Sequence, residues 1–542
     1  MPALRSPAFL PISPRALALA CTLALATPAC LAAGASTTPK GVTAGPCVEG
    51  ICEYRLSNGL RVLLFPDASK PTVTVNIAYG VGSVHENYGE TGMAHLLEHM
   101  LFKGTPKHGD IPGELKKRGI EANATTSLDR TNYYGSFPAN AETLDWLLGL
   151  EADRMVHSFV SKKDLDSEMT VVRNEMERNE NSPNGVMFQR MRSTAYLWHN
   201  YGNSTIGARS DVENVPIERL QAFYRSHYRP DNATLIIAGR IDPAASLELA
   251  HLHFGKLARP KTPLAAAYTV EPTQDGEREV NVRRSGDTRF IGIAYHTPGT
   301  AHPDSAALDV LMDVLGDTPT GRLHKALVET KLAAATAAGN NDLRDGGMGV
   351  LMLVAPKDAD TAKAEAELLR QIETHLAAAP ITADEVTQAK QRIANAYERS
   401  FTNVNGVAMA LTEAVAGGDW RLYFLQRDRI EQVTVDDVNR VARAYFKPSN
   451  RTLARFIPTE QAERVEIAAA PSAADALKGY VGKAALAAGE TFDPTPANSD
   501  ARSETFTIGD GLKVSLLPKD TRGDVVIVSA NFRFGDIESL KR

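Results

Sequence analysis

The sequence has few cysteines, no strong charge of either sign and no long apolar run in its main part. Only 4 of its 542 residues are cysteine, and Cys21 and Cys30 fall within the first 36 residues, so the remainder can form at most one internal disulfide. The formal net charge of −6 gives no reason to expect a nucleic-acid partner. Beyond residue 36 no apolar run is long enough to cross a bilayer, so we expect no transmembrane segment.

The N-terminal 36 residues have the pattern of an export signal. Arg5 and Arg15 precede the apolar run 16–26, and the small residues 33–35 (AGA) offer a cleavage site. The alternative is a short buried helix at an irregular N-terminus. Because charge, apolar run and small residues come in the expected order, we predict a signal peptide over 1–36 and a periplasmic or secreted protein.

The cysteines fit this prediction. Cys30 is a poor lipid acceptor because no aliphatic residue stands three positions before it, so we do not expect a lipid anchor. In an oxidising compartment Cys47 and Cys52 are free to join, and we predict a disulfide between them rather than two free thiols.

Length and apolar content predict three or four domains with buried cores, since 43% of the residues are hydrophobic. After a polar lead-in, Asn58 and Gly59 form a strong turn signal between two apolar segments, which predicts a hairpin. Further strands are expected at 73–78 and 233–238. The helices expected between them are 91–103, 111–119, 141–158 and 161–179. This pattern indicates an α+β domain that ends near residue 265.

A second block of mixed strands and helices begins near residue 278. Strands are expected at 279–282, 289–294 and 348–354, and helices at 304–316, 320–331, 359–378 and 383–399. An Ala/Pro/Ser-rich stretch follows, and we interpret it as a linker.

The opening of the chain recurs after this linker. Residues 506–518 parallel 54–66, and 525–528 parallel the strand at 73–76. Two unrelated hairpins with similar turns are the alternative, but the shared order of turn, strand, proline and strand favours a duplication. A lone hairpin cannot bury its apolar face, so we expect this chain to be the N-terminal half of a longer protein.

The segment 91–100 (TGMAHLLEHM) carries the chemistry. On a helix His95 and His99 lie four residues apart on one face, so both can reach one ion, and neutral imidazole is a good zinc ligand. Glu98 projects to the same side and can act as a general base rather than a ligand. This H-x-x-E-H order is the inverzincin signature, and chance occurrence is the alternative.

A catalytic zinc needs a third protein ligand. The predicted helix that starts near Ser161 offers Glu168 and Glu175, seven residues apart on one face, and also Glu177. By residue chemistry alone any of the three could serve, and the ordinary role of each is a solvated charge on a helix.

At this point the sequence resembles the pitrilysin/insulinase family of zinc peptidases, which includes the mitochondrial processing peptidases. In that family the third ligand is a glutamate about 75 residues past the second histidine, and 75 residues separate His99 from Glu175. The family's accompanying glutamate, seven residues earlier, falls on Glu168, which would orient a ligand or water. The resemblance therefore implies one zinc ion per chain on His95, His99 and Glu175, with Glu98 and Glu168 as catalytic residues.

Supporting motifs extend the resemblance over about residues 50–460. Residues 123–134 are similar to the family's N-A-x-T edge strand, which implies that Asn123, Ala124 and Thr125 bind substrate as an added strand. His199 lies in a segment similar to H-P-Y-G, with Asn200 replacing the proline, and we expect it to be structural. The segments 228–233 and 321–323 are similar to further family motifs.

The resemblance implies tandem homologous α/β-sandwich domains of the processing-peptidase type. We expect a zinc domain over 46–265, an inactive relative over 275–465, a linker over 466–502 and the start of a third domain over 503–542. The implied activity is endopeptidase cleavage of peptides or unfolded polypeptides inside a chamber. The missing C-terminal half or a homologous subunit would supply the opposite wall. The alternative is a non-catalytic partner or scaffold subunit, which the complete ligand set disfavours.

Overall fold

The structure is a computed structural model and describes residues 38–541, so the predicted signal peptide lies outside the described residues. The chain divides into one compact unit that ends at Ala462 and a second unit over Glu463–Arg542, which we describe separately. Among the described residues, no helix has the length and apolar character needed to cross a membrane.

The first block of the first unit, from β1 to α8, is built on a seven-stranded sheet with the order β1-β2-β3-β7-β4-β6-β5. Only the β3–β7 pair is parallel. The strands are β1 Val42–Val48, β2 Ile51–Leu56, β3 Arg61–Pro66, β4 Thr72–Tyr79, β5 Glu121–Thr126, β6 Thr131–Pro138 and β7 Ala233–Gly239. The helices are α1 Met93–Met100, α2 Ile111–Lys117, α3 Ala141–His157, α4 Lys162–Glu180, α5 Pro183–Ala195, α6 Arg209–Asn214, α7 Ile217–His227 and α8 Pro243–Phe254.

The second block, from β8 to β12, has a five-stranded sheet with the order β10-β11-β9-β12-β8. Its strands are β8 Arg278–Arg284, β9 Thr288–Thr297, β10 Ala335–Asp342, β11 Gly347–Pro356 and β12 Arg451–Pro458. Its α-helices are α9 Asp304–Gly316, α10 Thr361–Leu369, α11 Leu376–Ala378, α12 Ala383–Ser400, α13 Val404–Ala416, α14 Leu422–Gln432 and α15 Val435–Tyr445. Mixed helices and sheets confirm the predicted α+β class.

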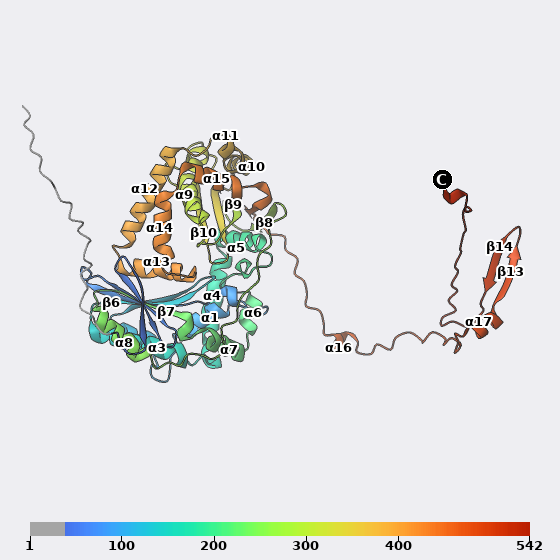
Figure 1. Cartoon of the computed structure of the whole chain (residues 1–542), viewed down its shortest axis with the longest axis horizontal. Coiled ribbons are helices and arrows are strands. Elements are labelled where there is room, and N and C mark those ends of the chain that lie inside the picture. Colours follow the sequence, from blue (N-terminus) through green and yellow to red (C-terminus); the bar gives the residue numbers. More distant parts are fainter. Residues whose placement is uncertain (1–37, 542) are drawn as a thin grey trace, which may run out of the picture. The chain divides into compact units, whose positions relative to one another are not determined.

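Each block covers one face of the other block's sheet. Alternate residues of a strand point to opposite faces. Val62 of β3 faces the first block's own helices, whereas Leu63 packs with Leu411 of α13. Figure 1 shows α13 lying against the first sheet. In return α5 packs on the second sheet, where Met187 contacts a cluster that includes Val350. Each block therefore has a core of its own on one face of its sheet, and the two blocks share further apolar clusters on the other faces.

Several segments of this unit differ from what the sequence led us to expect. The polar lead-in contains strand β1, because its backbone pairs with β2 and needs no apolar pattern to do so. Strand β10 was missed because its residues are small and polar (ATAAGNND). In the expected helix 320–331 the structure has a five-residue π-helix, His324–Val328, which wraps the chain more widely than an α-helix.

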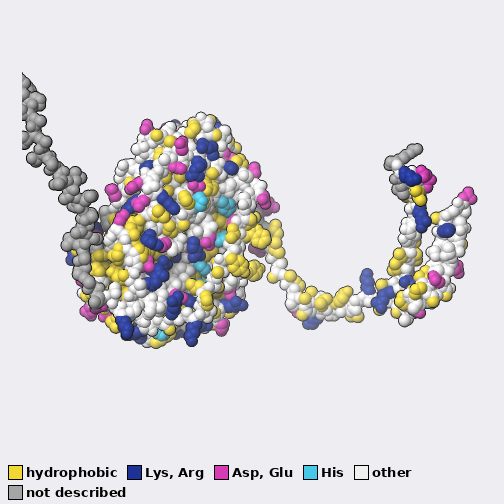
Figure 2. Space-filling model, viewed as in Figure 1, with side chains coloured by type: hydrophobic (Ala, Val, Ile, Leu, Met, Phe, Trp, Pro, Cys, Tyr) yellow, Lys and Arg dark blue, Asp and Glu magenta, His cyan; other side chains and the backbone are white. Residues whose placement is uncertain are grey.

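The predicted disulfide is confirmed. Cys47 and Cys52 are bonded and face each other in the β1–β2 register. The hairpin tip between them carries Glu49, which forms an ion pair with Arg427 of α14. The disulfide thus closes a hairpin that contacts the second block. On the face of the first unit shown in Figure 2, acidic and basic side chains are interspersed, as the small net charge suggests.

The second unit contains two short helices, α16 Ala473–Ala476 and α17 Pro496–Arg502, and one hairpin of β13 Glu504–Ile508 and β14 Leu512–Leu516. The hairpin occupies the place that the repeat predicts. The expected strand at 525–528 is not formed, and its side chains are exposed. A strand needs a neighbour to bond its backbone, and within the described residues of this unit none is paired with 525–528.

Candidate metal centre

Helix α1 holds the two histidines of the H-x-x-E-H segment. Its start is fixed by the buried carboxylate of Glu86, which accepts hydrogen bonds of 2.9 Å from the backbone N–H groups of Gly92 and Ala94. Burial raises the pKa of Glu86 to about 8, against the opposing effect of these two bonds. Gly92 has φ +94°, a left-handed conformation that glycine adopts without strain. The helix therefore begins at a defined residue and orients both histidines.

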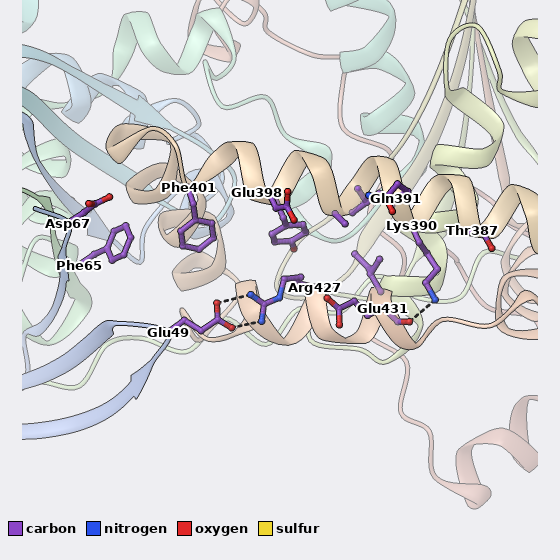
Figure 3. A pocket seen from close by; sticks show the side chains of 14 residues that line it. Glu49, Phe65, Asp67, Thr387, Lys390, Gln391, Glu398, Phe401, Arg427 and Glu431 are labelled. Carbon is purple, nitrogen blue, oxygen red and sulfur yellow. Dashed lines mark hydrogen bonds and ion pairs between the residues drawn. The ribbon is translucent and has the colours of Figure 1, made fainter. Parts of the chain in front are cut away.

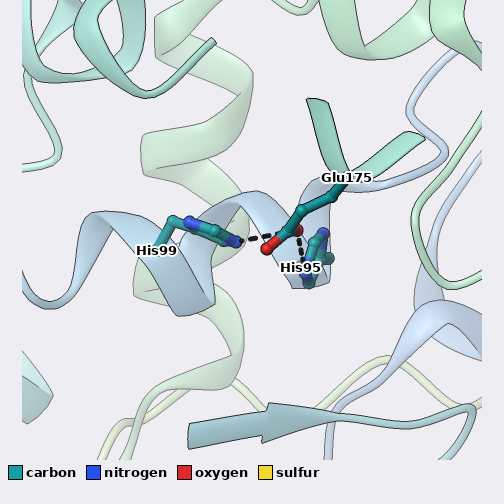
Figure 4. Close-up of side chains that lie close together, drawn as sticks. All are labelled: His95, His99 and Glu175. Atoms are coloured by element: carbon teal, nitrogen blue, oxygen red, sulfur yellow. Dashed lines mark ion pairs between the residues drawn. The ribbon is translucent and has the colours of Figure 1, made fainter. Parts of the chain in front are cut away.

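His95, His99 and Glu175 come together although the third residue lies on another helix. Oε2 of Glu175, from α4, is 3.5 Å from Nε2 of His95 and 3.5 Å from Nε2 of His99 (Figure 4). The three ligand atoms all lie within 4.8 Å of one another. Burial, and then the neighbouring His99, lower the pKa of His95 to about 4, which keeps its imidazole neutral.

This cluster fits a zinc ion. Zinc sits about 2.1 Å from nitrogen or oxygen ligands, so two ligands of a tetrahedral site lie about 3.4 Å apart. The two distances from Glu175 to the histidines match that separation. Two imidazoles and one carboxylate are also a donor set used by catalytic zinc sites, which leave the fourth position open.

The structure separates the three glutamates that the sequence left as alternatives. Oε2 of Glu168 is 3.1 Å from Nδ1 of His99, the ring nitrogen that does not face Glu175. Glu168 also forms an ion pair with Lys103. Glu177 points elsewhere and lies 3.4 Å from Arg209. Only Glu175 among them contacts both histidines at Nε2.

Glu98 lies beside the cluster, and its carboxylate forms a hydrogen bond with a residue of β5. The Thr126 hydroxyl of β5 donates to Oε2 of Glu98 at 2.5 Å. Burial raises the pKa of the Glu98 carboxyl, while the bond from Thr126 acts in the opposite direction. The carboxylate is thus held in place by the edge strand while it remains next to the two histidines.

A cavity of about 310 Å³ opens over the cluster. Its lining includes His95, Glu98 and Glu175. Of the three residues expected to bind substrate, Thr125 lines this cavity, whereas Ala124 is buried in the core and Asn123 is exposed on β5. Strand β5 stands at the edge of its sheet, so its outer side is the place where an extended peptide could add.

Sequence reasoning missed several residues of this region. Thr126 was not named among the substrate-binding residues, although it is the threonine of the N-A-x-T segment and that motif was the signal for it. Lys103 and Arg178 gave no signal, because long basic side chains on a surface are common. Arg130 lies within the recognised segment 123–134, but no role was assigned to it. Arg178 lines the cavity from α4.

The segment that contains His199 is built as the sequence suggested. His199 is buried, and its Nδ1 accepts from the backbone N–H of Tyr201. Asn200 donates hydrogen bonds of 2.8 Å to the carbonyl oxygens of Val84 and Glu86. This asparagine therefore links the segment to the turn that precedes α1.

A larger cavity of about 920 Å³ runs beside α12 (Figure 3). Phe65, Tyr397 and Phe401 supply apolar walls, and the pair formed by Glu49 and Arg427 lies at its side. It shares no lining residue with the cavity over the histidines.

Comparison with known proteins agrees with the fold. Residues 61–209 match the sequence profile of the insulinase family, peptidase family M16, and residues 214–393 match the profile described as the peptidase M16 inactive domain. The chain is 30% identical over 405 residues to the zinc protease PqqE of Helicobacter pylori, which covers 73% of this chain and 90% of that protein. The chain therefore belongs to the insulinase (M16) family.

Solved structures show the same fold. The crystal structure of a protease from Helicobacter pylori has a TM-score of 0.70 at 28% identity, over 75% of this chain and 99% of that chain. The periplasmic protease PqqL of Escherichia coli has a TM-score of 0.64 at 21% identity, over 87% of this chain and 55% of that chain. This chain thus spans about half the length of PqqL.

Proposed function

We propose that this protein is a zinc-dependent endopeptidase that hydrolyses peptide bonds of peptides or unfolded polypeptides. The observation that carries the proposal is the convergence of His95, His99 and Glu175 at the spacing of zinc ligands. A relative that covers most of the chain is a zinc protease, which supports the same activity.

The metal ligands, Glu98 and Glu168 have different roles in this proposal. His95, His99 and Glu175 hold the ion, which when bound supplies a Lewis acid for a peptide carbonyl and for water. Glu98 accepts the proton of the attacking water on its carboxylate and passes it to the leaving amine. Glu168 fixes the orientation of the His99 ring, because its Oε2 lies 3.1 Å from Nδ1 of that ring.

The substrate proposal rests on β5. An extended peptide that adds to this edge strand would bond through its backbone, and Asn123, Ala124 and Thr125 would be its neighbours. A backbone-bonded strand requires an unfolded segment. This favours peptides and unfolded chains over folded proteins.

We propose the domain boundaries expected from the sequence, with the zinc domain over 46–265, its inactive relative over 275–465 and a third domain from 503. The exposed apolar side chains of the second unit, such as Val526 and Phe534, support an additional half or homologous subunit that covers them. The similarity to the periplasmic protease PqqL supports export to the periplasm.

The second candidate is a non-catalytic partner subunit. It is disfavoured because a subunit without activity has no need of a base beside the ligands, whereas Glu98 is present and is held by Thr126.

The test is cleavage of a quenched peptide by the full chain, loaded with one equivalent of zinc, with and without a purified second half. Cleavage should disappear with a chelator and return with zinc. Glu98→Gln should keep about one zinc per chain and lose turnover. A zinc-loaded wild type that cleaves no peptide under either condition would support the partner-subunit alternative.

A further inference from the structure

Strand β5, beside the histidine cluster, is linked to α13 of the second block by a polar chain of hydrogen bonds that runs through Arg130 to Glu413. Strand β5 has one neighbouring strand, β6, so its position depends on side-chain contacts more than that of an inner strand does. Arg130, in the turn after β5, donates from Nη1 to the carbonyl oxygen of Thr125 at 3.1 Å and to Oδ1 of Asn132 at 2.9 Å. One guanidinium nitrogen therefore holds the end of β5 against β6.

The other side of the same guanidinium faces the second block. Nε of Arg130 donates to Oε1 of Glu413 at 3.1 Å, and Nη2 bonds to the same oxygen. Arg130 is 8% exposed, whereas the Glu413 side chain is 56% exposed. Without the Glu413 carboxylate, Nε and Nη2 of Arg130 would lose their acceptor, and the guanidinium would be held less firmly against Thr125.

The part of α13 that carries Glu413 is held against the first sheet. Glu413 stands on α13 next to Thr412, whose hydroxyl accepts from Nδ2 of Asn76 at 2.8 Å inside the first sheet. Asn76 in turn accepts from Nδ2 of Asn132 at 3.0 Å, and Asn132 is the residue that Arg130 contacts. Helix α13 thus meets both ends of this polar chain.

We infer that Glu413, a residue of the block without the metal ligands, is a positioning residue that holds β5 beside the metal centre through Arg130. The effect reaches the site because Thr126, the next residue after Thr125, donates the hydrogen bond that orients Glu98. The second block therefore has a part in arranging the site, in addition to enclosing it. The consequence for turnover rests on the proposed peptidase function, whereas the consequence for β5 does not.

The experiment compares the full chain with Glu413→Gln, Glu413→Asp and a matched control, Glu367→Gln. Glu367 also forms an ion pair with an arginine, Arg370, but the two lie next to each other within the second block. Hydrogen exchange is followed in peptides that cover 121–132, and kcat, KM and zinc content are measured on the same samples.

We expect Glu413→Gln to speed exchange over 121–132 by about two- to fivefold, the range for loss of one partly exposed ion pair. kcat should fall by a similar factor with a smaller change in KM and unchanged zinc content. Glu413→Asp should recover part of both effects, and Glu367→Gln should show neither.

Exchange over 121–132 that is the same in Glu413→Gln and wild type would overturn the inference. A wild type without zinc-dependent cleavage would defeat the proposed function instead, and the exchange comparison would still decide the role of Glu413.

Discussion

Oε2 of Glu168 lies 3.1 Å from Nδ1 of His99. The other ring nitrogen of His99, Nε2, faces Glu175, which belongs to the same helix α4. A contact like that at Nδ1 fixes the ring and its tautomer and makes the other nitrogen a better ligand. The two glutamates should therefore differ in what their loss does to metal binding.

We expect Glu168→Gln to weaken zinc affinity by about 10- to 100-fold, because Gln leaves Nδ1 of His99 without a negatively charged partner. Competition with a chromophoric chelator measures this. Glu177→Gln is the matched control, since Glu177 lies on the same helix and its carboxylate is 3.4 Å from Arg209. Equal affinities in Glu168→Gln and wild type would contradict the assigned role.

Glu175→Gln should lose zinc more completely than Glu168→Gln, because it removes a ligand rather than a neighbour of one. Metal analysis after gel filtration gives the zinc content directly. The comparison with Glu98→Gln is decisive. If Glu98→Gln loses zinc while Glu175→Gln keeps both zinc and activity, the ligand and the base have been exchanged.

Removal of the disulfide should destabilise the β1–β2 hairpin. Joining Cys47 to Cys52 closes a short loop, for which the chain-entropy model gives about 2 kcal/mol of stabilisation. Replacement of both cysteines by serine should lower the free energy of unfolding by about that amount in urea titrations. Mass spectrometry of non-reduced peptides checks the bond itself, and two alkylatable thiols in protein from its native compartment would refute it.

The packing of α13 on the first sheet should contribute a large part of the first unit's free energy of unfolding. Leu411 is fully buried between the blocks, so Leu411→Ala should cost about 2–5 kcal/mol and speed hydrogen exchange in β3 and β7. Leu425 of α14 is 41% exposed, and its change to alanine should cost far less. Similar losses in the two variants would show that α13 does not cover the sheet in solution.

Stability should also depend on pH through Asp309 of α9. Burial, and then the neighbouring Asp342, raise the pKa of Asp309 to about 7 from 3.8. The folded state then binds a proton that the unfolded state has released, so this group's stabilisation is complete below pH 3.8 and declines as pH rises toward 7. Wild type should lose stability over this window relative to Asp309→Asn in urea titrations at several pH values, and parallel pH curves would contradict the shift.

The sequence by itself determined what depends on neighbours along the chain. His95 and His99 share one face of a helix because four residues make about one turn, and this holds wherever the helix lies. The disulfide between Cys47 and Cys52 and the hairpin at 504–516 are local in the same sense.

Tertiary structure decided what depends on contacts between distant segments. Residue chemistry could not choose among Glu168, Glu175 and Glu177, and the family resemblance made the choice. The approach of α4 to α1 supplies its geometry. Strand β1 and the exposed segment 525–528 show the same limit, because a strand forms where a partner accepts its hydrogen bonds and fails where none is present. The sequence also could not predict that a helix of each block packs on the sheet of the other, since an apolar face in a sequence does not say which helix will bury it.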